Sequence, residues 1–243
     1  PGTSSKIAIP KGFTRVVFHD EFDGTGLPDA NKWDFEKGHL RNREKQYYVV
    51  GRTENSYLKD GFLHLIARND SARVDGEIRP ITSASIHTRN KFNFKYGRVE
   101  VRAKLPFSLG TWPAIWMMPA KKVYGEWPKS GEIDIMEHVG YEPEKIHYAV
   151  HTYETNSTKV GKGSNVFCPT SYTDFHIYAF EWYEDRLEWH LDGKTRFVLE
   201  KPANATWENW PFDQDFYLIL NLAFGGGWGG LKGIDPDSLP QEY

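Results

Sequence analysis

The stretch that decides the fold is His176–Glu200, "HIYAFEWYEDRLEWHLDGKTRFVLE". Apolar and polar residues alternate in three runs, which are separated at Glu184-Asp185 and at Asp192-Gly193. A period of two predicts half-buried strands, and Asp-Gly between two such runs predicts a tight turn because glycine tolerates a positive φ. We therefore expect three consecutive antiparallel strands over residues 176–200.

The same pattern continues on either side of this stretch. Three further segments read as strands: "NSYLKDGFLHLIARN" (55–69, with a turn at Asp60-Gly61), "YGRVEVRAKLP" (96–106) and "FYLILNLAFGG" (216–226). No segment of about 12 residues has an amphipathic helical period. Many short strands with regularly spaced turns predict an all-β fold, a β-jelly-roll sandwich of two antiparallel sheets, one of which can bend into a concave cleft. We expect residues 1–10 to form a tail or edge segment and residues 11–243 a single domain.

Composition narrows the class of protein. The chain has 243 residues and a net charge of −3 without a basic stripe, which argues against nucleic acid and anionic membranes as partners. No apolar run approaches the ~20 residues of a membrane span. The single cysteine, Cys168, excludes an intrachain disulfide. Aromatic residues make up 15%, with nine tryptophans, which is more than a core needs and suits the stacking of sugar rings.

The segment "SGEIDIMEHVG", Ser130–Gly140, concentrates acidic residues. Residues two apart in a strand share a face, so Glu132 and Asp134 point one way and Ile133 the other. A regular strand would turn Glu137 to the wrong face, but one extra residue, a β-bulge that we expect at Met136, returns it to the face of Glu132.

Three acids on one face repel one another and raise at least one pKa. Retaining glycoside hydrolysis fits this arrangement, because it needs two carboxyl groups roughly 5–5.5 Å apart. A third acid between them can help to keep their pKa values apart. The alternatives are a solvated acidic strand face and a cation site.

The segment "GEIDIME" resembles the active-site signature of glycoside hydrolase family 16, the family of laminarinases, lichenases, agarases and carrageenases. Its extra residue before the last glutamate is similar to the laminarinase-like and agarase-like branches. Other segments resemble the family in the same order: "FHDEFDG", "KDGFLHLIA", "YGRVEVRAKLP", "GTWPAIWMMP", "FEWYEDRLEWHLDG" and "LILNLAFGGGWGG". The resemblance implies a concanavalin-like jelly roll, with residues 11–243 as one catalytic domain.

The resemblance also implies roles for individual residues. Glu132 matches the nucleophile, Glu137 the acid/base and Asp134 an auxiliary acid. Further residues match substrate contacts: Trp112 and Trp116 as sugar-stacking rings, Asn42 on a loop, Asn221 in a strand, His151 as a histidine near the acid/base, and Trp228 on a glycine-rich loop. From the residues alone, the tryptophans could equally be core, Asn221 a satisfied core amide and His151 structural.

Two features depart from the family pattern. The family's last strand, similar to Val-Asp-Tyr-Val-Arg-Val-Tyr, has no counterpart before the chain stops at "SLPQEY". Many relatives hold a structural calcium, for which Glu21 matches one ligand and the carbonyl of Gly61 another, whereas the matching aspartate of the last strand is absent. The resemblance implies this ion only as a structural one, and no cofactor for catalysis.

The resulting prediction is an endo-acting retaining hydrolase of β-1,3- or mixed-linkage β-1,3-1,4-glucan. The alternatives are an agar-type galactan hydrolase of the same family and a non-catalytic β-glucan-binding jelly-roll protein, although the presence of both glutamates argues against the latter. We expect a monomer that is secreted, periplasmic or attached to the cell surface.

Overall fold

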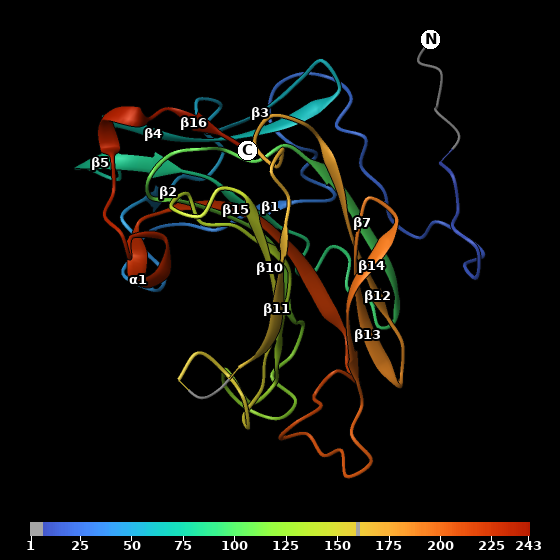
Figure 1. The fold of residues 1–243 in the computed structure, drawn as a ribbon. Coiled ribbons are helices and arrows are strands. Elements are labelled where there is room, and N and C mark those ends of the chain that lie inside the picture. Colours follow the sequence, from blue (N-terminus) through green and yellow to red (C-terminus); the bar gives the residue numbers. More distant parts are fainter. Residues whose placement is uncertain (1–6, 159–160) are drawn as a thin grey trace.

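The structure, a computed structural model, describes residues 7–158 and 161–243. Antiparallel strands form two packed layers, and a third sheet adjoins them (Figure 1). The helices within the described residues are short: α1 (Gly226–Gly229) and the 3-10 turn η1 (Pro236–Ser238). The prediction of an all-β jelly roll is confirmed.

The first layer is a seven-stranded antiparallel sheet that carries the acidic segment on β9 (Glu132–Glu137) at an inner position. In spatial order its strands are β1 (Asp34–Phe35), β6 (Ser85–His87), β15 (Phe216–Phe224), β8 (Thr111–Pro119), β9, β10 (Lys145–His151) and β11 (Lys162–Phe167). Since β9 is paired on both sides, its register and the direction of its side chains are fixed.

The second layer is the four-stranded sheet that residues 176–200 predict. Its order is β14 (Lys194–Glu200), β13 (Arg186–Leu191), β12 (His176–Trp182) and β7 (Gly97–Ala103), and Figure 1 shows these strands side by side. The three consecutive strands and both turns lie where the alternation predicts them.

A third sheet goes beyond the predicted two-sheet sandwich. It contains β16 (Gln241–Glu242), β4 (Phe62–Val74), β5 (Glu77–Ser83) and β2 (Tyr47–Tyr48), with β3 (Ser56–Lys59) paired to β4. The turn at Asp60-Gly61 joins β3 to β4 as predicted. However, β2 and β5 pair in parallel, which alternation cannot reveal because it is the same in both orientations.

The core lies between the two main layers and joins them by polar contacts as well as by packing. Trp182 and Trp189 of the four-stranded sheet are almost completely buried. The indole N–H of Trp189 donates to the backbone carbonyl of Asp134 at 2.9 Å, and that of Trp182 to the carbonyl of Phe212 at 2.9 Å. A buried tryptophan gains stability only if its N–H finds such a partner. The second layer therefore supports the acidic strand from behind.

The two ends of the chain differ in structure. Residues 1–6 of the predicted tail lie outside the described residues, and residues 7–10 form neither helix nor strand. At the other end, β16 pairs with Ile66 and Ala67 of β4, and the backbone of Tyr243 exchanges two hydrogen bonds with Leu65 at 2.8 Å.

Candidate active site

The bulge in β9 is present and aligns the three acids. Opposite β8, Trp116 pairs with Asp134 and Ile115 with Met136, which leaves Ile135 as the extra residue. The extra residue is therefore Ile135 and not Met136 as predicted. Directly opposed residues share a face of a sheet. Since Ile115 is a core residue, Met136 points into the core and Glu137 returns to the face of Asp134.

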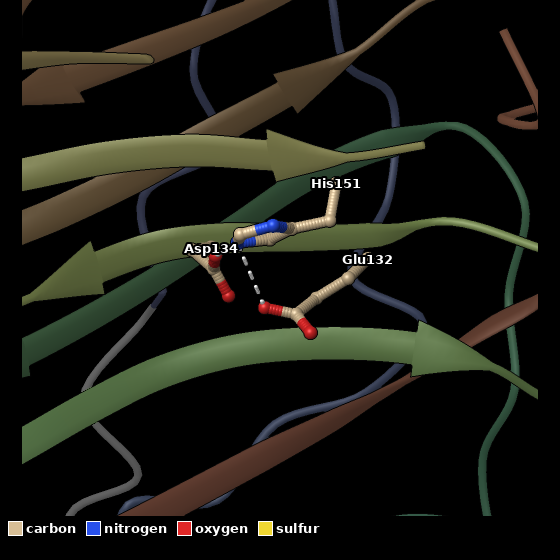
Figure 2. Close-up of side chains that lie close together, drawn as sticks. All are labelled: Glu132, Asp134 and His151. Atoms are coloured by element: carbon tan, nitrogen blue, oxygen red, sulfur yellow. Dashed lines mark ion pairs between the residues drawn. The ribbon is translucent and has the colours of Figure 1, made fainter. Parts of the chain in front are cut away.

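Strand β10 gives the same assignment of faces from the other side. It places His151 opposite Glu132, Ala149 opposite Asp134 and His147 opposite Glu137. Figure 2 shows Glu132, Asp134 and the ring of His151 pointing toward one another. The His151 Nε2 atom lies 3.1 Å from Asp134 Oδ2 and 3.5 Å from Glu132 Oε2. His151 thus contacts the residues that match the nucleophile and the auxiliary acid.

Burial and mutual repulsion change the titration of this cluster. Burial, and then the charges of Glu132 and Glu137, raise the pKa of Asp134 well above its usual range. Burial and the charge of Glu132 raise the pKa of Glu137 to about 7, although hydrogen bonds from Trp112 and Asp134 act in the opposite direction. Burial thus disfavours ionisation of Asp134, and Glu137 exchanges its proton near neutral pH.

Glu132 has different surroundings. Its side chain is 14% exposed, and the indole N–H of Trp127 donates to its Oε1 atom at 3.0 Å. Glu137 accepts the indole N–H of Trp112 in the same way, at 3.1 Å, but burial raises its pKa. Two carboxyl groups with contrasting surroundings are the arrangement from which acid and base roles are assigned.

All nine residues predicted to contact or transform a substrate line a single cleft with a volume of about 720 Å³. They are Asn42, Trp112, Trp116, Glu132, Asp134, Glu137, His151, Asn221 and Trp228. The spacing of four between the two β8 tryptophans places both on the cleft face of that strand.

Asn221 lines the cleft and is also a satisfied amide. Its Oδ1 atom accepts the Trp116 indole N–H at 2.7 Å, and its Nδ2 group donates to the Tyr48 hydroxyl at 2.9 Å. The guanidinium of Arg41 lies 5.0 Å from the Trp116 ring centre, and its orientation is fixed by a bidentate ion pair with Glu36. The Trp116 ring is thereby held in place from two directions.

The opposite wall of the cleft joins two segments that are distant in sequence. Trp228 lies on α1 rather than on a flexible loop, and its ring meets those of Trp112 at 5.5 Å and His147 at 4.8 Å. The carbonyl of Asn42 accepts the backbone N–H of Gly227 at 2.9 Å, and the Asn42 side chain donates to Glu44. Asn42 has a φ of 54°, a left-handed conformation that asparagine tolerates well.

Among the cleft residues that the sequence did not predict, Trp127 and Arg41 contact the acidic cluster or its tryptophans. Trp127, five residues before Glu132, hydrogen-bonds that carboxylate, and its ring lies 5.8 Å from that of His151. Arg41 stacks on Trp116, and it precedes the predicted Asn42 directly. In both cases, the signal in the sequence was a position close along the chain to a predicted site residue.

The residues that the resemblance implies as calcium ligands do not make up a full set of ligands. Glu21 is half exposed and lies 3.8 Å from His19, and Gly61 forms the β3–β4 turn. Among the described residues, Glu21 joins no group of three or more acidic, histidine or cysteine ligands. One carboxylate and one carbonyl fall short of the six to eight oxygen ligands that calcium takes. No step of catalysis is therefore assigned to this ion.

A cleft with a pair of carboxyl groups in contrasting surroundings, lined by tryptophans, defines a glycoside hydrolase. The family model described as glycosyl hydrolases family 16 matches residues 43–236. The chain is 45% identical over 236 residues to a beta-glucanase of Rhodothermus marinus, with 93% of this chain and 81% of the relative covered. The chain belongs to glycosyl hydrolases family 16.

Solved structures agree with this assignment. The laminarinase from Rhodothermus marinus superposes with a TM-score of 0.88 at 45% identity, with 93% of this chain and 92% of that chain covered. A mutant of SCLam, described as a non-specific endo-beta-1,3(4)-glucanase and carrying 1,3-beta-D-cellobiosyl-glucose at its active site, superposes with a TM-score of 0.90 at 37% identity. That alignment covers 97% of this chain and 93% of the other.

In the part of the chain that the structure describes, no helix has the length and apolar character needed to cross a membrane.

Proposed function

We propose that this glycoside hydrolase is an endo-acting, retaining β-glucan hydrolase that cleaves β-1,3-glucan, mixed-linkage β-1,3-1,4-glucan or both. The observation that carries the proposal is the alignment of Glu132, Asp134 and Glu137 along one strand at the floor of a tryptophan-lined cleft, with the pKa of Glu137 raised to about 7. An acid with a pKa near the working pH is the best general acid and base.

The roles follow from the surroundings of each carboxyl group. Glu137 donates its proton to the glycosidic oxygen while the Glu132 carboxylate attacks the anomeric carbon, so that the leaving chain departs as an alcohol and a glycosyl ester forms on Glu132. Glu137, now ionised, takes a proton from a water molecule that attacks the same carbon and releases Glu132. Two inversions give net retention, and both carboxyl groups return to their starting states.

Asp134 supports this cycle from between the two glutamates. Burial and the charges of Glu132 and Glu137 raise its pKa, and its side chain can hydrogen-bond to either glutamate as negative charge moves between them. Since the His151 Nε2 atom lies beside both Glu132 and Asp134, we propose that His151 orients this pair.

The substrate class rests on the relatives and on the aromatic lining. The relatives are described as a beta-glucanase, a laminarinase and an endo-beta-1,3(4)-glucanase, and the last of these structures holds a glucan fragment at its active site. Trp112, Trp116 and Trp228 provide the flat apolar surfaces that pack against the C–H faces of sugar rings.

A reducing-end assay over five polysaccharides tests this proposal. We expect new reducing ends from laminarin, barley mixed-linkage glucan and lichenan, and none from agarose or porphyran. Cleavage of the galactans alone would identify the galactan hydrolase. Binding of glucan without cleavage of any polymer would identify a binding protein instead.

The stereochemistry is tested separately from the substrate. NMR spectra of freshly formed product should show the β-anomer first, before mutarotation. Early appearance of the α-anomer would contradict a covalent intermediate on Glu132.

Three further predictions remain open. Because the polymeric substrate cannot cross a membrane, we expect the enzyme to act outside the cytoplasm, whether secreted, periplasmic or at the cell surface. We also expect a monomer, to be checked by light scattering of the eluting protein.

A structural calcium at Glu21 and Gly61 would lower the melting temperature of the protein when EDTA removes it. Added Ca²⁺ should then restore the original melting temperature.

A further inference from the structure

A second cluster of two glutamates and a histidine lies on the four-stranded sheet, outside the cleft. Glu181 of β12 is paired directly opposite Glu188 of β13, and His190 follows Glu188 two residues later on the same face. That face points away from the core, since Phe180, Trp182 and Trp189 occupy the other one. Figure 1 shows the two strands adjacent in that layer.

The imidazole of His190 is aimed into this cluster. The residue is 8% exposed, and its Nε2 atom is buried without a hydrogen-bond partner. It lies 3.3 Å from Glu188 Oε1 and 3.7 Å from Glu181 Oε2. On the other side of the ring, Nδ1 lies 3.3 Å from the Thr195 hydroxyl, which can accept a hydrogen bond from a protonated Nδ1. In that tautomer, the Nε2 lone pair faces two carboxylate oxygens, an arrangement that a cation bound between them would stabilise.

The spacing favours an ion larger than a proton. Ligand atoms about 2.1 Å from a tetrahedral zinc lie roughly 3.4 Å from one another. The two distances from Nε2 are close to this value, whereas both exceed the 2.7–3.2 Å of an N–H···O hydrogen bond. All three ligand atoms lie within 4.8 Å of one another. We propose that Glu181, Glu188 and His190 bind a divalent transition-metal ion of the Zn²⁺ class, with water as the fourth ligand.

Neighbouring side chains orient these ligands. The Tyr183 hydroxyl donates to Glu181 Oε1 at 2.6 Å, and Arg186 Nε donates to Glu188 Oε2 at 2.7 Å, so each glutamate presents its other oxygen to His190. Such outer hydrogen bonds are usual around metal ligands. Arg98 also donates to Glu181 Oε2 at 2.5 Å and competes with the metal for that oxygen. The site should therefore bind in the micromolar range rather than as tightly as a structural zinc.

Titration of the whole protein with Zn²⁺ tests the proposal. Protein freed of metal with EDTA and then desalted is titrated with ZnCl₂ in a calorimeter, and with CoCl₂ while visible absorption is recorded. We expect one saturable site for Zn²⁺ on this sheet, and a Co²⁺ spectrum of the intensity typical of four-coordinate cobalt. Absence of saturable binding to the unmodified protein would overturn the proposal, and would mean that a proton occupies the cluster.

Matched variants separate this site from the cleft, where Glu132, Asp134 and His151 form the other candidate group among the described residues. His190→Asn and Glu188→Gln should each weaken Zn²⁺ binding at least 10-fold and abolish the cobalt spectrum, whereas His151→Asn should retain both. Unchanged hydrolytic activity of His190→Asn shows that this variant is folded. Equal binding in His190→Asn and the unmodified protein would also refute the assignment.

Discussion

The two carboxylate–histidine clusters use the same residue types and the same strand geometry, yet they differ in electrostatics. In each, two acids and a histidine lie across a pair of antiparallel strands, with Nε2 within 4 Å of both carboxylates. In the cluster on the four-stranded sheet, Arg98 forms an ion pair with Glu181, and Arg186 forms one with Glu188. Among the ion pairs of the described residues, none joins an arginine or lysine to Glu132, Asp134 or Glu137.

The presence or absence of arginine changes the direction of the pKa shifts. Burial acts to raise the pKa of Glu181, but hydrogen bonds from Tyr183 and Arg98 outweigh it and hold that pKa below its usual range. In the cleft, burial and like charge raise the pKa of both Asp134 and Glu137. The pKa of Glu181, which has an arginine partner, is therefore shifted in the opposite direction to those of Asp134 and Glu137, which have none.

The largest expected effect on kcat comes from removing Glu132, whereas the matched substitution of Glu188 should have almost none. Glu132→Ala should lower kcat at least ~10⁴-fold, because the nucleophile is lost, while oligosaccharide binding is retained. Glu188→Ala, its counterpart on the other sheet, should change kcat less than about 2-fold. Both are measured by reducing-end release from laminarin together with calorimetric binding of an oligosaccharide. Comparable turnover by Glu132→Ala would exclude its role as nucleophile.

The next effect is on the pH profile. Because Glu137 must carry a proton in the first step and its pKa is raised to about 7, kcat/KM should fall as pH rises above about 7. Glu137→Gln should lower kcat on polysaccharide about 10²–10⁴-fold and remove this alkaline limb. An alkaline limb that persists in the variant would assign the ionisation to another group.

The same substitution should affect stability in a pH-dependent way. A folded-state pKa above the usual 4.5 means that the native protein binds more protons than the unfolded chain between about 4.5 and 7, so its stability falls as pH rises through this window. Glu137→Gln should therefore melt at a higher temperature than the unmodified protein at pH 8, and the difference should disappear near pH 4.

A smaller effect is expected from the sugar-facing ring that Asn221 and Arg41 hold. Trp116→Ala should lower kcat/KM about 10–100-fold, mainly through KM, because it removes a stacking surface worth about 1.5–3 kcal/mol. Tyr183→Ala removes an aromatic ring beside the other cluster and should leave kcat/KM unchanged. A similar loss in both variants would point to general destabilisation, which melting curves would reveal.

The smallest effect concerns single hydrogen bonds to a glutamate. Trp127→Phe keeps the ring but removes the N–H that donates to Glu132 at 3.0 Å, and should lower kcat about 10-fold. Tyr183→Phe likewise removes the donor to Glu181 at 2.6 Å and should have no kinetic effect. If the Trp127→Phe variant had full activity, this hydrogen bond would have no part in catalysis.

The sequence by itself determined which segments form strands and which faces they bury. Alternation and Asp-Gly turns are local properties of the backbone, so β12, β13 and β14 and the turn at Asp60-Gly61 lie where they were predicted. The same local geometry predicted that a bulge brings Glu132, Asp134 and Glu137 to one face. The nine residues that the family resemblance implies as catalytic or substrate-contacting all line one cleft.

Tertiary structure decided what depends on partners that are distant in the chain. Trp116 meets Asn221, 105 residues away, and Glu181 gains a partner in Arg98, 83 residues away. Strand pairing likewise decides that His151 lies beside Glu132 and that the extra residue of the bulge is Ile135. Alternation gives the face on which a side chain lies but not its neighbours on that face, because these depend on strand order and register, and they set the electrostatics of both clusters.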